Sequence, residues 1–172
     1  MTENPEKLNN QAIILAAGGS YNEAIACFKR AIVIQKNNYL LWYNLGVTYR
    51  DAGNLGDAKN ALAMAYKIAP ENDDVVETYA TIALMQGQLH EVAHICEEGL
   101  DLNPLNSHLW NLMGVANFQT EDYEEAAEFF EQAVSINPYY LDALYNLRDT
   151  YSILENKSGE AECDKKIREI EK

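Results

Sequence analysis

Apolar residues recur along this chain at intervals of three and four positions, the spacing that places side chains on one face of an α-helix. The pattern returns ten times, and short turns containing Gly, Asn or Pro separate the segments. Trp42, Leu45 and Tyr49 give the clearest example. No segment shows the sustained alternation that is typical of a β-strand. The sequence therefore predicts an all-α protein built from short helices.

The predicted helices follow a 34-residue period. Pro70, Pro104 and Pro138 are each separated by 34 residues, and Trp42 and Trp110 lie at twice that interval. Cutting the chain at this period gives five repeats of two helices each: 5–38, 39–72, 73–106, 107–140 and 141–172. Because each repeat buries its apolar face against its neighbours, we expect one domain over residues 1–172.

The second repeat carries the most complete set of characteristic residues. They are Trp42, Leu45, Gly46 and Tyr49 in its first helix, Ala58, Leu62 and Ala65 in its second helix, and Pro70 at its end. This set resembles the tetratricopeptide repeat (TPR) at every signature position. The resemblance implies a right-handed α-solenoid of helix-turn-helix repeats with a concave groove.

Several signature residues have a direct physical role. Gly46 and Ala58 are small, so the two antiparallel helices of the repeat can approach closely. Gly53 tolerates the left-handed backbone that ends the first helix. Pro70 ends the second helix, because its ring cannot continue the hydrogen-bond ladder.

The other repeats keep this pattern to different extents. The fourth repeat has Trp110, Met113, Gly114, Ala126, Phe130, Ala133 and Pro138, with Asn117 in the place of Tyr49. In the fifth repeat Arg148 stands where a glycine is expected. The last segment is mostly charged, with Ala161, Ile167 and Ile170 on one side. This composition predicts a polar capping helix, which the end of a repeat stack requires.

In TPR proteins partners usually bind in the concave groove, which the first helix of each repeat lines. The resemblance therefore implies a candidate site at the groove-facing positions: Asn10, Leu40, Tyr43, Asn44, Val47, Arg50, Glu77, Thr81, Leu84, Asn111, Val115, Phe118, Tyr145 and Asn146. Several of these residues are apolar or aromatic, and exposed apolar patches often mark interaction surfaces. Two alternatives stay open: a sharply curved stack buries these side chains itself, or a C-terminal helix folds into the groove.

Asparagine recurs at one place of the first helix, at Asn10, Asn44 and Asn146. In many TPR arrays an asparagine there binds the backbone of a ligand, and amides can hold an extended peptide without reading its sequence. The alternative is that asparagine is simply common at this place. A carboxylate clamp for acidic chaperone tails is not predicted, because Asn9, Asp74 and Thr78 stand where basic residues are required.

The charge of the chain restricts its partners. The sequence has 13 Lys and Arg against 27 Asp and Glu, a formal net charge of −14. No Lys or Arg occurs between Lys67 and Arg148. This balance argues against nucleic-acid binding, which requires clustered basic residues. It predicts either a solubilising surface or the steering of a basic or amphipathic partner segment.

Two features hold residue types that can do chemistry. The segment from His90 to His94 matches the zinc-protease pattern His-Glu-x-x-His, but it lies within a predicted second helix and no third ligand follows from the sequence. Cys27, Cys96 and Cys163 are widely spaced and are predicted to be buried, reduced thiols. We therefore expect no metal, no cofactor and no enzymatic activity.

The leading interpretation is a non-enzymatic scaffold or adaptor that binds a peptide or helix of another protein in its groove. The alternatives are a TPR chaperone for a secreted or assembling client, and an array that uses its outer face within a larger assembly. The chain has no apolar run long enough to span a membrane, so the cytoplasm is the expected compartment. The sequence identifies neither the partner nor the oligomeric state.

Overall fold

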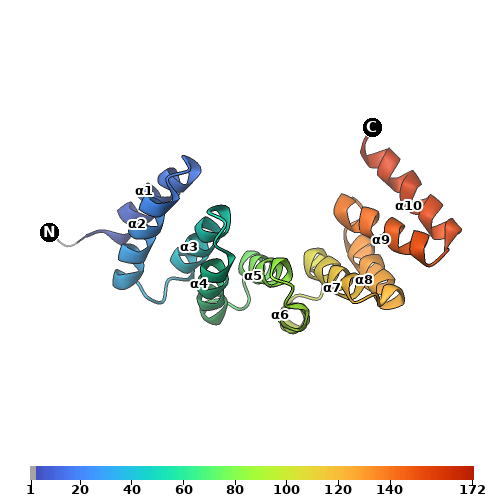
Figure 1. Ribbon diagram of the computed structural model, residues 1–172, viewed down its shortest axis with the longest axis horizontal. Helices are drawn as coiled ribbons and strands as arrows, with labels where there is room; N and C mark the ends of the chain where they lie inside the picture. Colours follow the sequence, from blue (N-terminus) through green and yellow to red (C-terminus); the bar gives the residue numbers. More distant parts are fainter. Residues whose placement is uncertain (1–2) are drawn as a thin grey trace. The chain divides into compact units, whose positions relative to one another are not determined.

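The computed structural model describes residues 3–172, and ten α-helices account for most of this range (Figure 1). The first helices of the five repeats are α1 (Pro5–Ala17), α3 (Tyr39–Asp51), α5 (Asp73–Met85), α7 (Ser107–Gln119) and α9 (Leu141–Ile153). The second helices are α2 (Tyr21–Ile34), α4 (Leu55–Ile68), α6 (Leu89–Leu102), α8 (Tyr123–Ile136) and α10 (Lys157–Ile170). Equivalent helices begin 34 residues apart, which confirms the predicted repeat and the all-α solenoid fold.

An asparagine immediately before the first helix starts that helix in four repeats. Asn4, Asn38, Asn72 and Asn106 each accept a hydrogen bond from a backbone N–H of the first turn. Such caps satisfy amide groups that have no partner within the helix. Tyr140 holds this place in the fifth repeat and makes no side-chain cap. The sequence analysis did not predict these caps, although the 34-residue spacing of the four asparagines was visible.

The first helix of every repeat ends at a residue with a left-handed backbone. In three repeats this residue is glycine, and Gly53 has the φ of +79° that the sequence predicted. In the fourth and fifth repeats the residues are Glu121 and Glu155, with φ of +65° and +57°. A side chain with a Cβ disfavours this conformation, so these two turns carry local strain that the glycine turns avoid.

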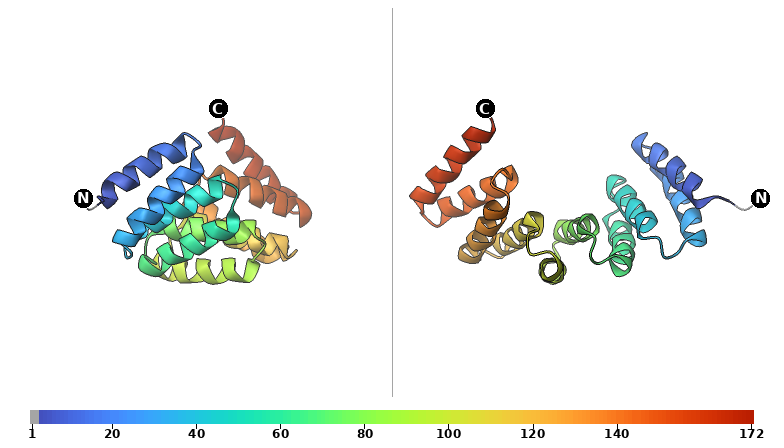
Figure 2. Two further views of the ribbon diagram at one scale, coloured as in Figure 1. Left: turned by 60° about the vertical axis from the view of Figure 1, so that its left-hand side comes forward. Right: turned by 180° about the vertical axis from the view of Figure 1, so that it is seen from behind.

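The chain divides into two compact units, an N-terminal unit of residues 1–86 and a C-terminal unit of residues 87–172. In the N-terminal unit α1 packs on α2, α3 packs on both α2 and α4, and α5 packs on α4. In the C-terminal unit α7 packs on α6 and α8, and α9 packs on α8 and α10 (Figure 2). The single domain, the superhelical path and the concave groove stay predictions.

Small residues allow the two helices of a repeat to approach closely. A Cβ at Gly46 would lie 2.6 Å from Leu62 Cγ, and a Cβ at Gly114 would lie 2.5 Å from Phe130 Cε1. In the fifth repeat Arg148 replaces this glycine, and its guanidinium lies 3.8 Å from the carboxylate of Asp164. A polar pair thus stands where the other repeats place a glycine against a large apolar side chain.

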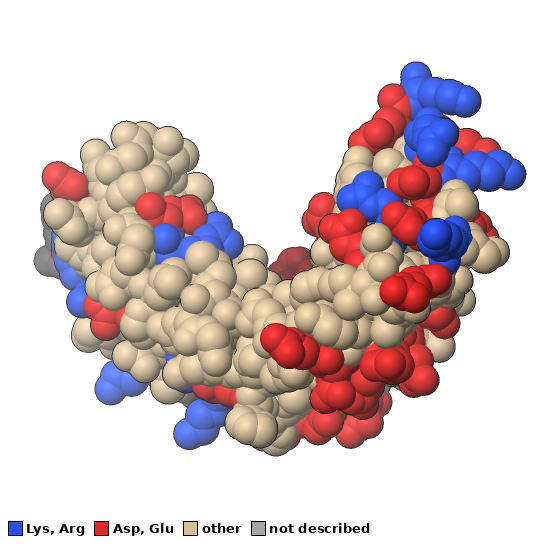
Figure 3. Space-filling view, turned by 45° about the vertical axis from the view of Figure 1, so that its right-hand side comes forward, with Lys and Arg blue, Asp and Glu red and all other residues tan. Residues whose placement is uncertain are grey.

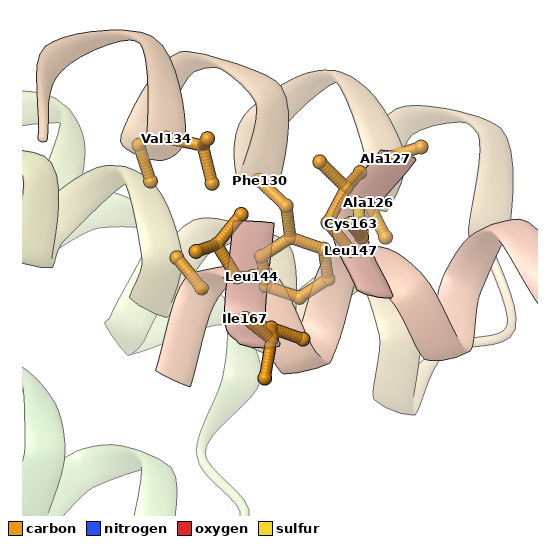
Figure 4. Close-up of a cluster of buried hydrophobic side chains, with 10 residues drawn as sticks. Ala126, Ala127, Phe130, Val134, Leu144, Leu147, Cys163 and Ile167 are labelled. Carbon is orange, nitrogen blue, oxygen red and sulfur yellow. The ribbon is translucent and has the colours of Figure 1, made fainter. Parts of the chain in front are cut away.

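The core of the C-terminal unit centres on Phe130, which is 1% exposed (Figure 4). Leu144 and Leu147 of α9 pack around it, and α10 contributes Cys163 and Ile167 to the same cluster. The opposite side of α10 is exposed and largely charged, and includes Lys165 and Arg168. This helix therefore caps the last repeat as predicted: one side is apolar and the other faces solvent.

Candidate functional site

The predicted site residues fall on the first helices of both units. In the N-terminal unit Asn10 and Leu40 are exposed, whereas seven residues are half-buried: Tyr43, Asn44, Val47, Arg50, Glu77, Thr81 and Leu84. We call these nine residues the α1–α5 surface. In the C-terminal unit Asn111 is buried, and the remaining four residues are half-buried: Val115, Phe118, Tyr145 and Asn146. We call these five residues the α7–α9 surface.

Side chains of these surfaces form hydrogen bonds between neighbouring repeats. Asn44 Nδ2 donates to Asn9 Oδ1 over 3.1 Å, and Asn146 Nδ2 donates to Asn111 Oδ1 over 2.9 Å. Both pairs are 35 residues apart, and the hydroxyls of Tyr43 and Thr78 meet at the same spacing over 3.4 Å. Asparagine at this place therefore joins consecutive first helices.

These bonds do not use the full capacity of the amides. A carboxamide has two N–H donors and one acceptor oxygen, so the amides of Asn44 and Asn146 each keep further capacity toward solvent. Asn10, at the same place in the first repeat, is exposed. The three asparagines thus divide into two that join repeats and one at the rim of the N-terminal unit.

The α7–α9 surface encloses an apolar cavity of about 120 Å³ within the C-terminal unit. Val115 and Phe118 of α7 line it, together with Phe130, Asn146 and Asp149. Phe118 is held by an edge-to-face contact with Tyr123, at 5.2 Å between ring centroids. The cavity thus offers apolar walls with a carboxamide and a carboxylate at its edge.

Phe130 is the one lining residue that the sequence analysis assigned to packing alone. Its ring lies against Gly114, the smallest residue of the facing helix, so it reaches through toward the surface of α7. The pairing of a glycine with a large aromatic residue 16 positions later was the available signal.

The α1–α5 surface has a different opening at its N-terminal end, with a volume of about 270 Å³. Its lining includes Asn10 and Leu40, both predicted, and also Asn9, Gln35 and Asn38. Asn38 Nδ2 donates to Gln35 Oε1 over 2.9 Å, which fixes two of these amides. This opening is rich in amides, whereas the cavity of the α7–α9 surface is mostly apolar.

Charged groups flank the aromatic ring of Tyr145. The Arg148 guanidinium lies over the ring at 5.0 Å from its centroid and bonds Asp149 over 2.7 Å. The Tyr145 hydroxyl donates to Glu171 Oε1 over 2.5 Å, and this bond raises the pKa of Tyr145. Glu171 directly follows α10, so the end of the capping helix reaches one residue of the α7–α9 surface. The alternative that a C-terminal helix covers the site thus applies at Tyr145.

A second polar cluster lies beside the Asn111–Asn146 pair. Asn111 Nδ2 donates to the Tyr140 hydroxyl over 3.4 Å, and that hydroxyl also lies 3.3 Å from His108 Nδ1. The rings of His108 and Tyr140 are in contact, with 4.7 Å between centroids. The start of α7 is thereby tied to the start of α9 on the same side as the predicted site.

The zinc-protease pattern lies on α6. His90 and His94 are both exposed, and His94 Nε2 lies 3.8 Å from Glu98 one helical turn later. Within residues 3–172 no three His, Cys, Asp or Glu side chains are arranged to hold a metal ion. The pattern therefore coincides with an exposed helix face without a third ligand.

The three cysteines are buried and free, as predicted. Burial raises the pKa of Cys96 to about 12 and also raises that of Cys163. A thiol with a raised pKa is a poor nucleophile at neutral pH, because only the thiolate reacts. These side chains belong to the core of their helices.

Acidic side chains gather on the surface of the C-terminal unit, and Lys and Arg appear there only toward its last helices (Figure 3). This arrangement follows from the sequence between Lys67 and Arg148, which holds no basic residue. Over the described residues no helix is both long and apolar enough to cross a membrane.

Known families match most of the chain. Residues 30–139 match the cytochrome c-type biogenesis protein H TPR domain, and residues 8–38 match the tetratricopeptide repeat. Tetratricopeptide repeat protein 13 of Homo sapiens is 29% identical over 132 residues, which are 73% of this chain and 15% of that protein. Cytochrome c-type biogenesis protein CycH of Pseudomonas aeruginosa is 29% identical over 122 residues, which are 69% of this chain and 30% of that protein. The chain thus spans less than a third of either relative.

Solved structures share the fold at lower sequence identity. MamA of Desulfovibrio magneticus RS-1 aligns with a TM-score of 0.85 at 20% identity, over 99% of this chain and 97% of that one. YrrB, described as a TPR protein with an unusual peptide-binding site, aligns with a TM-score of 0.73 at 21% identity, over 95% of this chain and 84% of that one. Together with the family match, which covers more than half of the sequence, these findings show that the chain belongs to the tetratricopeptide repeat family.

Proposed function

We propose that the chain is a non-enzymatic protein-interaction scaffold whose first helices bind a peptide or helix of a partner protein. The observation that carries this proposal is the apolar cavity of the α7–α9 surface, with Val115 and Phe118 on its walls. A small apolar cavity with a few polar groups at its edge suits an apolar anchor side chain on a polar backbone. Asn146 and Asp149 supply those polar groups.

The chemistry of the partner follows from charge. The C-terminal unit is acidic over most of its length, and complementary charge speeds association and rejects wrong partners. We propose a partner segment that is basic and amphipathic, with an apolar residue for the cavity. The description of YrrB as a peptide-binding TPR protein supports this class of ligand.

We also propose that the five repeats act as one domain over residues 1–172, so that both first-helix surfaces serve the same partner. The amides around Asn10 and Asn44 would then hold the backbone of the partner while the cavity takes its anchor. The free, buried cysteines support a reducing compartment, and therefore the cytoplasm, as the place of action.

The test is a pull-down from native lysate with the wild type and two single variants. Tyr43→Ala removes an aromatic ring from the α1–α5 surface, and Phe118→Ala removes one from the α7–α9 surface. Val33→Ala is the matched control, because Val33 is a 72% exposed apolar residue on the second helix of its repeat. Circular dichroism establishes that each variant is folded.

We expect the wild type and Val33→Ala to recover the same protein, and Phe118→Ala to lose it. High salt should weaken the recovery, because it screens the acidic surface. Loss in Tyr43→Ala as well would support a shared site across both surfaces. Equal recovery by all four proteins, at low and high salt, would refute the proposed site.

A further inference from the structure

The C-terminal unit has a second and larger cavity, of about 330 Å³, among α8, α9 and α10. Leu144, Leu147 and Tyr151 of α9 line it, with Val134 from α8 and Cys163 from α10. Successive residues of a helix are rotated by about 100°, so these three α9 residues lie opposite the face that carries Asn146 and Asp149. We call this space the α8–α10 cavity. It is separate from the proposed partner site.

Two other repeats hold a tryptophan at the position of Leu144. Trp110 lies 34 residues before Leu144, and its Nε1 donates to the carbonyl of Pro104 over 2.9 Å. Trp42 makes the equivalent bond to the carbonyl of Lys36 over 2.8 Å. The repeat therefore has a place for an indole, and a carbonyl six residues before it accepts the indole N–H.

The fifth repeat keeps the surroundings of this place but has lost the aromatic side chains. Pro138, 34 residues after Pro104, lines the α8–α10 cavity. In the fourth repeat Trp110 stacks on Phe129, at 5.9 Å between centroids. The residues at these two positions in the fifth repeat are Leu144 and Cys163. Replacing an indole and a phenyl ring by these smaller side chains removes volume where the cavity lies.

The walls of the α8–α10 cavity are held in place by their own contacts. The Tyr151 hydroxyl donates to Glu131 Oε1 over 2.5 Å, and burial together with this bond raises the pKa of Tyr151. The ring of Tyr151 lies against Gly159, where a Cβ would come within 2.6 Å of it. A fixed wall lowers the cost of ordering that binding would otherwise incur.

The charged groups at the cavity are mostly acidic. Glu131 and Glu162 both line it, and the one basic lining residue, Lys166, lies 3.1 Å from Glu162. A ligand that carries a positive charge beside its aromatic ring is therefore favoured over an anionic one.

We propose that the α8–α10 cavity binds the side chain of a tryptophan that a partner protein presents next to a basic residue. The indole would lie over Leu144 and between Val134 and Tyr151, with its N–H directed to the carbonyl of Pro138. The neighbouring basic residue would pair with Glu131 or Glu162. An indole combines a large apolar surface with one donor, and this is the chemistry that the repeat accommodates at Trp42 and Trp110.

The test uses three probes in amide ¹H–¹⁵N NMR titrations of the full chain. The tripeptide Ac-Lys-Trp-Lys-NH₂ carries the proposed group, Ac-Lys-Leu-Lys-NH₂ is its control, and N-acetyltryptophanamide represents a free aromatic molecule. We expect the tryptophan peptide to shift the amides of Val134, Leu147 and Tyr151. We expect the leucine peptide to bind at least about ten-fold more weakly.

Variants separate this site from the partner site proposed above. Leu144→Trp fills the cavity with the side chain of its repeat equivalents, and it should abolish binding of the tryptophan peptide. The exposed pair Glu131→Gln and Glu162→Gln leaves the core unchanged and provides the test should Leu144→Trp fail to fold. It should weaken the tryptophan peptide but not N-acetyltryptophanamide. Phe118→Ala should leave binding of both unchanged.

Unchanged binding in a folded Leu144→Trp protein, or shifts that map elsewhere, would overturn the proposal. Equal affinity of the two peptides would do the same. Binding of N-acetyltryptophanamide without binding of the tryptophan peptide would identify a small aromatic molecule, and would rule out a partner tryptophan.

Discussion

The carboxamide of Asn146 donates to the side-chain oxygen of Asn111 over 2.9 Å, and thereby joins α9 to α7 at the predicted interaction surface. Asn111 is only 7% exposed, so its oxygen has few alternative donors. The same relationship joins Asn44 to Asn9 in the N-terminal unit. The position that the family resemblance assigned to ligand binding therefore also holds neighbouring repeats together.

Replacing Asn146 should lower stability as well as change the surface. In Asn146→Ala the buried oxygen of Asn111 loses its donor, which we expect to cost about 1–3 kcal/mol. The measurement is the free energy of unfolding in urea. Asn10→Ala is the matched control, because Asn10 is exposed at the equivalent place, and it should change stability by less than about 0.5 kcal/mol. Equal effects of the two substitutions would contradict a joining role for Asn146.

Gly114→Ala should destabilise the fourth repeat, because the new Cβ would lie 2.5 Å from the ring of Phe130. Overpacking of this kind typically costs about 1–3 kcal/mol. Gly56→Ala provides the control, since Gly56 lies in α4 with nothing within 4 Å of its Cβ position. There alanine should stabilise by up to about 1 kcal/mol, because it is the better helix former. Urea unfolding of both variants compares opposite expected signs at two helical glycines, and a shared sign would contradict the close approach.

The sequence was sufficient for the repeat, the helices and the fold, because a 34-residue period repeats the same packing five times. Gly46 and Gly114 were read correctly as sites of close approach, since a missing side chain is visible in the sequence. The site was less predictable. That Asn44 bonds Asn9, or that Phe130 reaches a surface cavity, depends on side-chain placement between helices. The α8–α10 cavity arises from two replacements, Leu144 and Cys163, that are unremarkable one at a time.

The strained turns at Glu121 and Glu155 predict a simple stabilisation. A residue with a Cβ pays roughly 1–2 kcal/mol for left-handed backbone, whereas glycine adopts it freely at a smaller cost in chain entropy. Glu121→Gly and Glu155→Gly should each stabilise the protein by about 0.5–1 kcal/mol. Thermal and urea unfolding provide the measurement. The reverse change, Gly53→Ala, should destabilise, and a gain in stability there would contradict the assigned turn geometry.

The buried thiol of Cys96 predicts a loss of stability at alkaline pH. Burial raises its pKa from 9.0 to about 12 in the folded protein, so above pH 9 the unfolded chain releases a proton that the folded chain keeps. Deprotonation then favours the unfolded state, and the contribution of Cys96 is complete below pH 9 and declines above it. Cys96→Val replaces the thiol by an apolar side chain that does not titrate. Between pH 8 and about 10.5 the unfolding free energy of the wild type should fall more steeply than that of the variant. Parallel pH profiles would show that Cys96 is accessible to solvent in the folded protein, contrary to its position in the core.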